Sequence, residues 1–336
     1  MKAAIYKESG KPFVISDVPD PVAGPGEAII KVCRCGICGS DINLTSGSPF
    51  DFPRGIAIGH EYAGEVVALG AGIKHLKLGD RVTAMPIAGC GHCEACSKGF
   101  PFHCSQGRSM MGGFAEYTRI DERYTFKIPD MLSFDDGALI EPLACGARAV
   151  RHGNVGPGVK VLIVGAGAMG MAALYWSHLL GAENIGVTAS SLRREDLARA
   201  MGASYFLAAG DDLCERAADA LGGPADVVFE CAGADSTIAQ SINLVKPGGT
   251  VVVMGACSHD IKFIPLIAVG KEVRLQFSLA YDLQDFQRTL DQFSAGCTEP
   301  RAMINQTISL DALPQKMELM RQPHYECKVM VDPWKR

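Results

Sequence analysis

The segment from Cys90 to Cys104 spaces four cysteines as C-x2-C-x2-C-x7-C, with Cys93 and Cys96 between the outer two. Four thiolates at this spacing can surround a tetrahedral zinc ion, with Zn–S bonds of about 2.3 Å. An iron–sulfur cluster fits less well, because the last gap is long and Ser105, not proline, follows the fourth cysteine; unligated thiols are the other alternative. A closed four-sulfur site leaves no coordination position open, so we expect a structural zinc here and catalysis elsewhere.

A second pattern, VLIVGAGAMG, places Gly165, Gly167 and Gly170 at G-x-G-x-x-G spacing, with Ala168 and Met169 between the last two. The first glycine permits a tight turn, the second a close approach of a pyrophosphate, and the third the packing of a helix on a strand. The N-terminus of that helix then faces the phosphates with its partial positive charge. Glycines also serve ordinary turns, but between a predicted strand (159–164) and a predicted helix they indicate a dinucleotide site.

The residues after the next predicted strand (184–188) bear on which dinucleotide binds. Sites that prefer NAD carry Asp or Glu about 20 residues after the glycines, to bind the ribose 2′-hydroxyl. Here the strand is followed by ASSLRR, in which Ala189 and Ser190 leave room for a 2′-phosphate and Arg193 and Arg194 can pair with it. We therefore expect NADP(H) to be preferred over NAD(H). The alternative is that both arginines lie on a solvated helix face, neutralised by the two acidic residues that follow.

These patterns lie in two regions that differ in predicted secondary structure. Up to about Pro129, short β-rich runs broken by glycine and proline predict an irregular, barrel-like β domain. From about Val159, strands alternate with helices in the βαβ pattern of a parallel sheet. The closing run CKVMVDP is again typical of a strand and could rejoin the first domain. We expect an α/β protein with one domain formed by residues 1–143 and 284–336 and a doubly wound domain formed by residues 144–283.

The composition limits the classes of function. A net charge of −5 and the lack of a dense Lys/Arg block argue against nucleic acid. No apolar run reaches the ~18 residues that a membrane span needs, and the first residues do not resemble a signal peptide. The 13 cysteines are odd in number, so metal ligands and free thiols are favoured over disulfides. We expect a cytoplasmic protein that acts on a small molecule.

Three further segments are GICGSD with Cys38, IGHEYAGEVVALG with His60 and Glu61, and ALIEPLACG with Glu141. Together with the four cysteines, GAGAMG and the closing KVMVDP, they occur in an order that resembles the zinc-dependent medium-chain dehydrogenase/reductase family. That family includes alcohol, polyol and threonine dehydrogenases, and the resemblance covers essentially the whole chain. It implies a GroES-like catalytic domain carrying the structural-zinc lobe and a Rossmann nucleotide-binding domain.

The resemblance implies that Cys38, His60 and Glu141 bind a catalytic zinc, and that Glu61 can ligate it or hydrogen-bond a zinc-bound water. Which glutamate is the standing third ligand stays open. Three protein ligands leave a fourth position for a substrate oxygen, where the metal would lower the pKa of an alcohol and favour departure of hydride. Taken singly, the His–Glu pair could be an ordinary polar contact and Cys38 a buried thiol.

Residues next to Cys38 complete the implied site. Asp41 is expected to orient a ligand histidine from behind, or else to cap a helix. Ser40 matches the family's hydroxyl that passes a proton between the zinc-bound oxygen and the nicotinamide ribose; its alternative role is also a helix cap. Asn43 stands where many relatives have histidine, and asparagine cannot titrate near neutrality. The proton would then leave through the ribose and water, or through a water on Glu61.

The substrate is less defined. Aromatic residues in predicted loops could line an apolar cleft or pack in the core: Phe50, Phe52 and Phe114. Ala280 precedes Tyr281, where sugar-alcohol members often have arginine. We expect a primary or secondary alcohol with its aldehyde or ketone, and NADPH-dependent carbonyl reduction as the working direction. The alternatives are a polyol dehydrogenase or ketose reductase, a threonine-dehydrogenase-like enzyme, and a non-catalytic NADPH-binding protein.

The family resemblance also implies a homodimer or homotetramer. The expected contact is edge-to-edge pairing of the nucleotide-domain sheets, with the strands near Val251 and Val273 as candidates.

Overall fold

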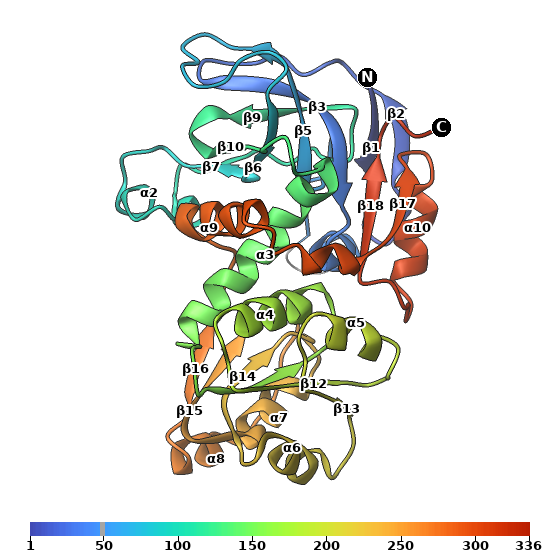
Figure 1. Ribbon diagram of the computed structural model, residues 1–336. Coiled ribbons are helices and arrows are strands. Elements are labelled where there is room, and N and C mark those ends of the chain that lie inside the picture. The colour runs from blue at the N-terminus through green and yellow to red at the C-terminus, as the bar shows by residue number, and fades with distance from the viewer. Residues whose placement is uncertain (48–50) are drawn as a thin grey trace. The chain divides into compact units, whose positions relative to one another are not determined.

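The computed structural model describes residues 1–47 and 51–336, and it divides into two units (Figure 1). The first unit comprises Met1–Glu141 and Asp282–Arg336, and the second comprises Pro142–Tyr281. Within the described ranges, no helix is both long enough and apolar enough to span a bilayer.

The first unit is built mainly from antiparallel sheets. Its largest sheet has the strand order β10-β6-β5-β3-β18-β17, and β9 pairs with β3 as well. A smaller sheet has the order β2-β1-β4, and β7 pairs with β8. The strands are β1 (Lys2–Tyr6), β2 (Val14–Asp17), β3 (Glu27–Gly36), β4 (Ile56–Ala57), β5 (Glu61–Leu69), β6 (Arg81–Ala84), β7 (Ile87–Ala88), β8 (Arg108–Ser109), β9 (Tyr117–Asp121), β10 (Thr125–Lys127), β17 (Ile304–Ser309) and β18 (Lys328–Asp332). The helices are α1 (Gly39–Asn43), α2 (Glu94–Ser97), η1 (Pro101–His103), η2 (Glu122–Tyr124), α3 (Phe134–His152, which continues into the second unit), α9 (Leu283–Ser294), η3 (Glu299–Met303) and α10 (Leu313–Met320).

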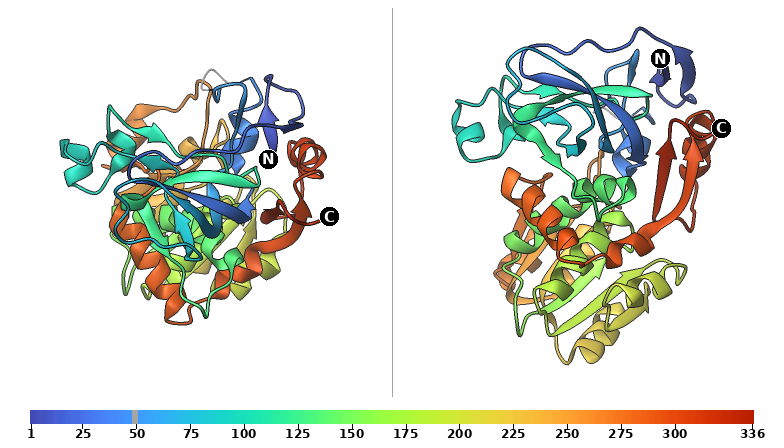
Figure 2. Two further views of the ribbon diagram at one scale, coloured as in Figure 1. Left: turned by 90° about the horizontal axis from the view of Figure 1, so that it is seen from above. Right: turned by 45° about the horizontal axis from the view of Figure 1, so that its top comes forward.

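The C-terminal strand β18 lies beside β3, far from it in sequence (Figure 2). The two strands run antiparallel, with Met330 opposite Gly36 and Val331 opposite Cys35. Both are rich in apolar residues, and they share one core with β5 and β6. This register places Lys328, the first residue of β18, next to the turn that leads from β3 into α1. In that turn, the N–H of Ile37 donates to the carbonyl of Val329, the residue after Lys328.

The second unit is a parallel sheet with the strand order β13-β12-β11-β14-β15-β16. Its strands are β11 (Lys160–Val164), β12 (Asn184–Ala189), β13 (Tyr205–Ala208), β14 (Ala225–Glu230), β15 (Val245–Val253) and β16 (Arg274–Phe277), and its helices are α4 (Ala168–Leu179), α5 (Glu195–Ala200), α6 (Leu213–Leu221), α7 (Thr237–Leu244) and α8 (Pro265–Gly270). Helices α4 and α5 lie on one side of the sheet, and α6 and α7 lie on the other (Figure 1). The strand order reverses between β11 and β14, which is where open α/β sheets bind ligands. The predicted α/β fold with an irregular β domain and a doubly wound sheet is confirmed.

The order of the strands corrects one prediction about the sheet edge. Val251 lies on β15, which is paired with β14 on one side and β16 on the other, so it cannot pair with a second sheet. Val273 directly precedes β16, which is one of the two edge strands of this sheet in the described part of the chain, β13 being the other.

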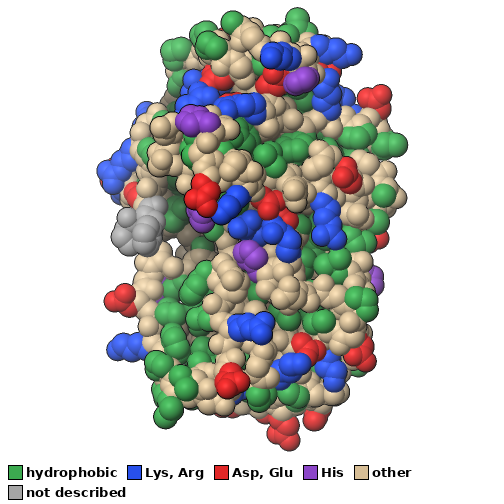
Figure 3. All heavy atoms as spheres, turned by 90° about the vertical axis from the view of Figure 1, so that its left-hand side faces the viewer, with side chains coloured by type: hydrophobic (Ala, Val, Ile, Leu, Met, Phe, Trp, Pro, Cys, Tyr) green, Lys and Arg blue, Asp and Glu red, His purple; other side chains and the backbone are tan. Residues whose placement is uncertain are grey.

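Charged side chains of both signs are interspersed on the face of the molecule drawn in Figure 3. This mixture follows from the composition, in which 32 Lys and Arg residues stand against 37 Asp and Glu residues.

Candidate functional site

Three potential metal ligands from the first unit lie close together. A ligand atom from each of Cys38, His60 and Glu61 lies within 4.8 Å of the other two. Antiparallel pairing explains this proximity, because Gly36 at the end of β3 is opposite Glu61 at the start of β5. Cys38 then follows β3 as the residue before α1. Two strand ends and one helix start thus bring a sulfur, a nitrogen and an oxygen donor to one place.

Asp41 holds the first two donors in position. One carboxylate oxygen, Oδ1, lies 3.2 Å from Nδ1 of His60, and the other, Oδ2, accepts from the N–H of Cys38 at 2.9 Å. The side chain is fully buried. Asp41 therefore occupies both of the positions expected from the sequence, since it caps the start of α1 and also lies behind the histidine ring. This contact to Nδ1 leaves Nε2 for a metal ion.

The electrostatics of the cluster fit a cation. Burial alone would lower the pKa of His60, but the charges of Asp41 and Cys38 outweigh it and raise that pKa well above its ordinary value. The surroundings therefore stabilise a positive charge at the position of the ring. A mixed S/N/O set of this kind is typical of zinc sites that keep one coordination position open.

Sequence analysis missed one residue of this cluster, Lys328. Its ammonium group donates to both carboxylate oxygens of Glu61, at 2.7 and 2.6 Å, and to the carbonyl of Ile37 at 3.2 Å. Lys328 is 1% exposed and Glu61 is 0% exposed. Burial lowers the pKa of Lys328, but the Glu61 carboxylate outweighs this effect and raises it above its ordinary value. The one sequence feature that could have indicated this role is that Lys328 begins an otherwise apolar strand.

The close approach of Glu61 to β3 requires a glycine opposite it. A Cβ atom on Gly36 would lie 2.0 Å from Oε2 of Glu61 and 3.2 Å from Cδ of Lys328. The absence of a side chain at this position therefore makes room for the ion pair.

Glu141 is buried on α3, at the last position of the first unit. It is not among the ligand atoms that lie mutually within 4.8 Å in the described part of the chain. It lies near the residue after Glu61, Tyr62. Burial is the main cause that raises the pKa of Tyr62, and the charges of Cys35 and Glu141 add to it.

The other residues expected around the cluster differ in exposure. Ser40 is half-buried on α1, and Asn43 is exposed at the end of the same helix. Phe114 is fully buried in the core, with its ring edge-on to Phe13, and Phe52 packs against the same core. These two aromatic residues therefore pack in the core rather than line an apolar cleft. The third, Phe50, lies outside the described residues.

The four-cysteine loop, residues 89–107, also brings its donors together. The sulfur atoms of Cys90, Cys93, Cys96 and Cys104 all lie within 4.8 Å of one another. The N–H of Cys90 donates to the sulfur of Cys104 at 3.3 Å. Backbone N–H groups, that of His92 foremost, lower the pKa of Cys90. Four converging sulfurs, with one thiol held toward its ionised form, match the donor set of a closed structural zinc site.

In the second unit, the glycine loop has the geometry that its sequence predicts. Gly165 has φ +108°, and a Cβ there would lie 2.8 Å from the N of Ala232. A Cβ on Gly170 would lie 1.9 Å from the carbonyl oxygen of Gly165. Gly167 is the residue before α4, and the space around its missing side chain is open except for Arg194 at 3.9 Å. Ala168 and Met169 form the first turn of α4.

The residues expected to select the cofactor follow β12. Ala189 is the last residue of the strand, and Ser190 and Arg193 are exposed in the turn after it. Arg194 reaches back to the glycine loop, where it donates to the carbonyl of Ala166 at 3.0 Å.

The first of the two acidic residues that follow is already engaged elsewhere. Glu195 pairs with Arg199 one helical turn later, with 2.9 Å between Nη2 and Oε1.

The sequence matches two protein-family models. Residues 24–130 match the alcohol dehydrogenase GroES-like domain, and residues 168–295 match the zinc-binding dehydrogenase domain. Sorbitol dehydrogenase of Bacillus subtilis (strain 168) is 31% identical over 346 residues, which cover 99% of this chain and 97% of that protein. (R,R)-butanediol dehydrogenase of the same strain is 31% identical over 352 residues, which cover 99% of this chain and 100% of that protein.

A solved structure leads to the same family. It is a zinc-binding dehydrogenase from Sinorhizobium meliloti 1021 bound to NADP, with a TM-score of 0.89 and 32% sequence identity over 99% of both chains. Given these matches across both units, the chain belongs to the zinc-dependent medium-chain dehydrogenase/reductase family.

Proposed function

We propose that this protein is a zinc-dependent dehydrogenase that transfers hydride between NADP(H) and a primary or secondary alcohol, or the corresponding aldehyde or ketone. The observation that carries the proposal is the Cys38–His60–Glu61 cluster, in which His60 and Glu61 are buried and Cys38 is partly exposed, with Asp41 behind the histidine. Zinc bound there would act as a Lewis acid on the substrate oxygen. The four cysteines of the second cluster would hold a structural zinc.

The side chains of the cluster have distinct roles in this proposal. Cys38, His60 and Glu141 would hold the metal. Asp41 keeps the His60 ring in one orientation, and its hydrogen bond from the N–H of Cys38 holds the thiolate turn in place. Ser40 would accept and hand on the proton of the substrate hydroxyl, because its own hydroxyl both donates and accepts.

Glu141 is the better candidate for the third protein ligand. Both oxygens of Glu61 already accept from Lys328, so Glu61 would have to give up a buried ion pair in order to ligate. Zinc content should therefore fall by one ion per chain in Glu141→Ala and stay unchanged in Glu61→Gln. Equal loss of zinc in the two variants would contradict this assignment.

Two observations support the preference for NADP(H). No acidic residue stands in the turn directly after β12, and Arg194 lies against the glycine loop. Comparing kcat/KM for NADPH and NADH tests the preference. Arg194→Ala should lower kcat/KM for NADPH by about 10–100-fold and lower that for NADH much less, because loss of the bond to Ala166 affects both cofactors whereas loss of the phosphate interaction affects NADPH alone. Arg199→Ala is the matched control; a wild-type enzyme that favours NADH would refute the preference.

A polyol is the second candidate substrate, because one relative is a sorbitol dehydrogenase. The sequence feature against it is Ala280, which stands where sugar-alcohol members often carry an arginine. A panel of simple alcohols and ketones against sugar alcohols and ketoses separates the two. We expect higher kcat/KM for the simple substrates, and the opposite order would select the polyol function. A zinc-loaded protein with no turnover across the panel would favour a binding role.

We also propose that the protein is a homodimer or homotetramer in which two copies pair through β16. This edge strand and the neighbouring α8 carry exposed apolar side chains, among them Leu266, Ile264, Val269 and Phe277. An exposed apolar strand edge is a liability unless it is covered, and a second copy covers it symmetrically. Sedimentation of the wild type and of Leu266→Asp/Val269→Asp tests this: the variant should be monomeric. A monomeric wild type would refute it.

A further inference from the structure

The four-cysteine loop is joined to the rest of the first unit by two very short strands. In β7 and β8, Ile87 is opposite Ser109 and Ala88 is opposite Arg108. The loop between them holds the four sulfurs. A ladder of this length is too short to hold a loop by itself.

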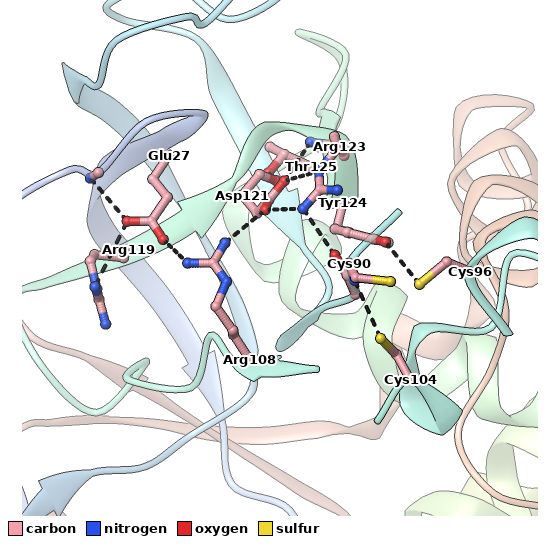
Figure 4. A network of polar contacts seen from close by, with 12 residues as sticks. Glu27, Cys90, Cys96, Cys104, Arg108, Arg119, Asp121, Arg123, Tyr124 and Thr125 are labelled. Carbon is pink, nitrogen blue, oxygen red and sulfur yellow. Dashed lines mark hydrogen bonds and ion pairs between the residues drawn. The ribbon is translucent and has the colours of Figure 1, made fainter. Parts of the chain in front are cut away.

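A buried carboxylate outside the loop, Asp121, contacts Arg108, which directly follows the loop, and Arg123 on η2 (Figure 4). Its Oδ2 lies 3.2 Å from Nη2 of Arg108 and 2.8 Å from Nη2 of Arg123. Its Oδ1 accepts from Nε and from the backbone N–H of Arg123, both at 3.0 Å. Asp121 is 4% exposed, whereas both guanidinium groups are about half exposed. One carboxylate thus holds two cations.

Each of these arginines leads to a different end of the loop. Arg108 lies on β8, just after the last cysteine, and also pairs with the buried Glu27 at the start of β3. Arg123 donates to the carbonyl of Gly89 at 3.0 Å, directly before the first cysteine. Both ends of the loop are therefore attached to Asp121 through charge-assisted hydrogen bonds.

The first cysteine turn is packed tightly against the same side chains. A Cβ on Gly91 would lie 2.6 Å from Nη1 of Arg123, and a Cβ on Gly89 would lie 2.3 Å from the sulfur of Cys96. The hydroxyl of Tyr124 donates to that sulfur at 3.9 Å. The glycines on each side of the first cysteine allow this close fit.

We propose that Asp121 is a positioning residue for the four-cysteine site, and that through Arg108 and Arg123 it sets how slowly that site releases its zinc. The proposal rests on the proposed presence of zinc there. Asp121 is not itself one of the four ligands. Its effect would come from keeping both ends of the loop in place, so that the sulfurs stay at their mutual distances when one Zn–S bond opens.

The test is the rate of zinc release to an excess of a chromogenic chelator, measured on the full-length chain. A Cys38→Ser background removes a ligand of the other cluster, so that the four cysteines are the remaining zinc site. Asp121→Asn keeps the shape and the acceptor oxygen of the side chain but removes its charge. We expect release about tenfold faster than from the unmodified background.

The matched control is the neighbouring carboxylate on η2. Glu122 accepts from the backbone N–H groups of Lys74 and Leu76, which lie outside the loop. Glu122→Gln should release zinc at the background rate. Arg108→Gln, which detaches one end only, should give an intermediate rate, and it keeps the test available if Asp121→Asn does not fold.

The outcomes are distinct. If the background, Asp121→Asn and Arg108→Gln all release zinc at the same rate, the proposed role of Asp121 is wrong. The assignment of a zinc ion to the four cysteines is then unaffected. Equal acceleration by Glu122→Gln would overturn the role of Asp121 too, because any change on η2 would then suffice. A Cys38→Ser protein that binds no zinc would overturn the assignment of the four cysteines, and the proposed role of Asp121 with it.

Discussion

Replacing Lys328 by methionine removes the cation of a fully buried ion pair and leaves Glu61 charged without its partner. Lys328 makes two hydrogen bonds to Glu61 and one to Ile37, and at most 1% of either charged residue is exposed. Breaking a buried pair from one side costs about 3–5 kcal/mol, because the remaining charge stays desolvated. Lys328→Met should therefore lower the free energy of unfolding of the first unit by that amount.

Urea unfolding followed by tryptophan fluorescence can report on this unit alone. The chain has two tryptophans: Trp334 lies in the first unit and Trp176 in the second. In a Trp176→Phe background the signal comes from Trp334, whose indole N–H donates to the carbonyl of Val32 on β3. With a slope of about 2 kcal/mol per M, the urea midpoint should fall by roughly 2 M.

The double variant Glu61→Gln/Lys328→Met separates the ion pair from simple packing. It removes both charges, so it should recover most of the stability that Lys328→Met loses. If the double variant is as unstable as Lys328→Met, the loss comes from packing, and the electrostatic reasoning is refuted. Unchanged stability of Lys328→Met itself would refute it more directly.

Three further predictions follow from single residues. Asp136 is buried and forms an ion pair with Arg301. Burial raises the pKa of Asp136, but the guanidinium outweighs this effect and holds the pKa below its ordinary value of 3.8. Asp136→Asn should therefore lower the free energy of unfolding by about 2–3 kcal/mol at pH 7. The wild-type advantage should be complete above pH ~4 and vanish as pH falls through the lowered folded pKa, which unfolding midpoints from pH 7 to 2.5 would show. Gly170→Ala forces a Cβ against the carbonyl of Gly165, so dinucleotide affinity measured by NADPH fluorescence should fall by more than about tenfold, and an unchanged affinity would contradict the packing of this turn. Cys93→Ser should reduce the zinc content by one ion per chain, measured by plasma emission; an unchanged count would argue against a four-cysteine site.

Sequence reasoning succeeded where the requirement is local. The roles of Gly165 and Gly170 depend on atoms a few residues away, and their spacing alone indicates the turn. The four cysteines likewise converge within one short loop. The family resemblance and the α/β fold rest on such local motifs read in order.

Reasoning from sequence failed where the requirement is long-range. Lys328 became part of the site only through the register of β18 on β3, and a lysine at the start of a strand usually faces solvent. Val251 was expected at a sheet edge, but position in the sheet depends on strand order rather than on apolar content. Phe114 shows the same limit, since a predicted loop does not say which way its aromatic side chain turns.

The separation of Glu61 from Lys328 also matters for how the protein is made. The lysine is synthesised 267 residues after the glutamate, which at about 5–20 residues/s is a delay of roughly 15–50 s. All of the second unit is translated in that interval. The Glu61–Lys328 ion pair therefore cannot form until the whole second unit has been translated. β18, which carries this lysine, completes the main sheet of the first unit only after that.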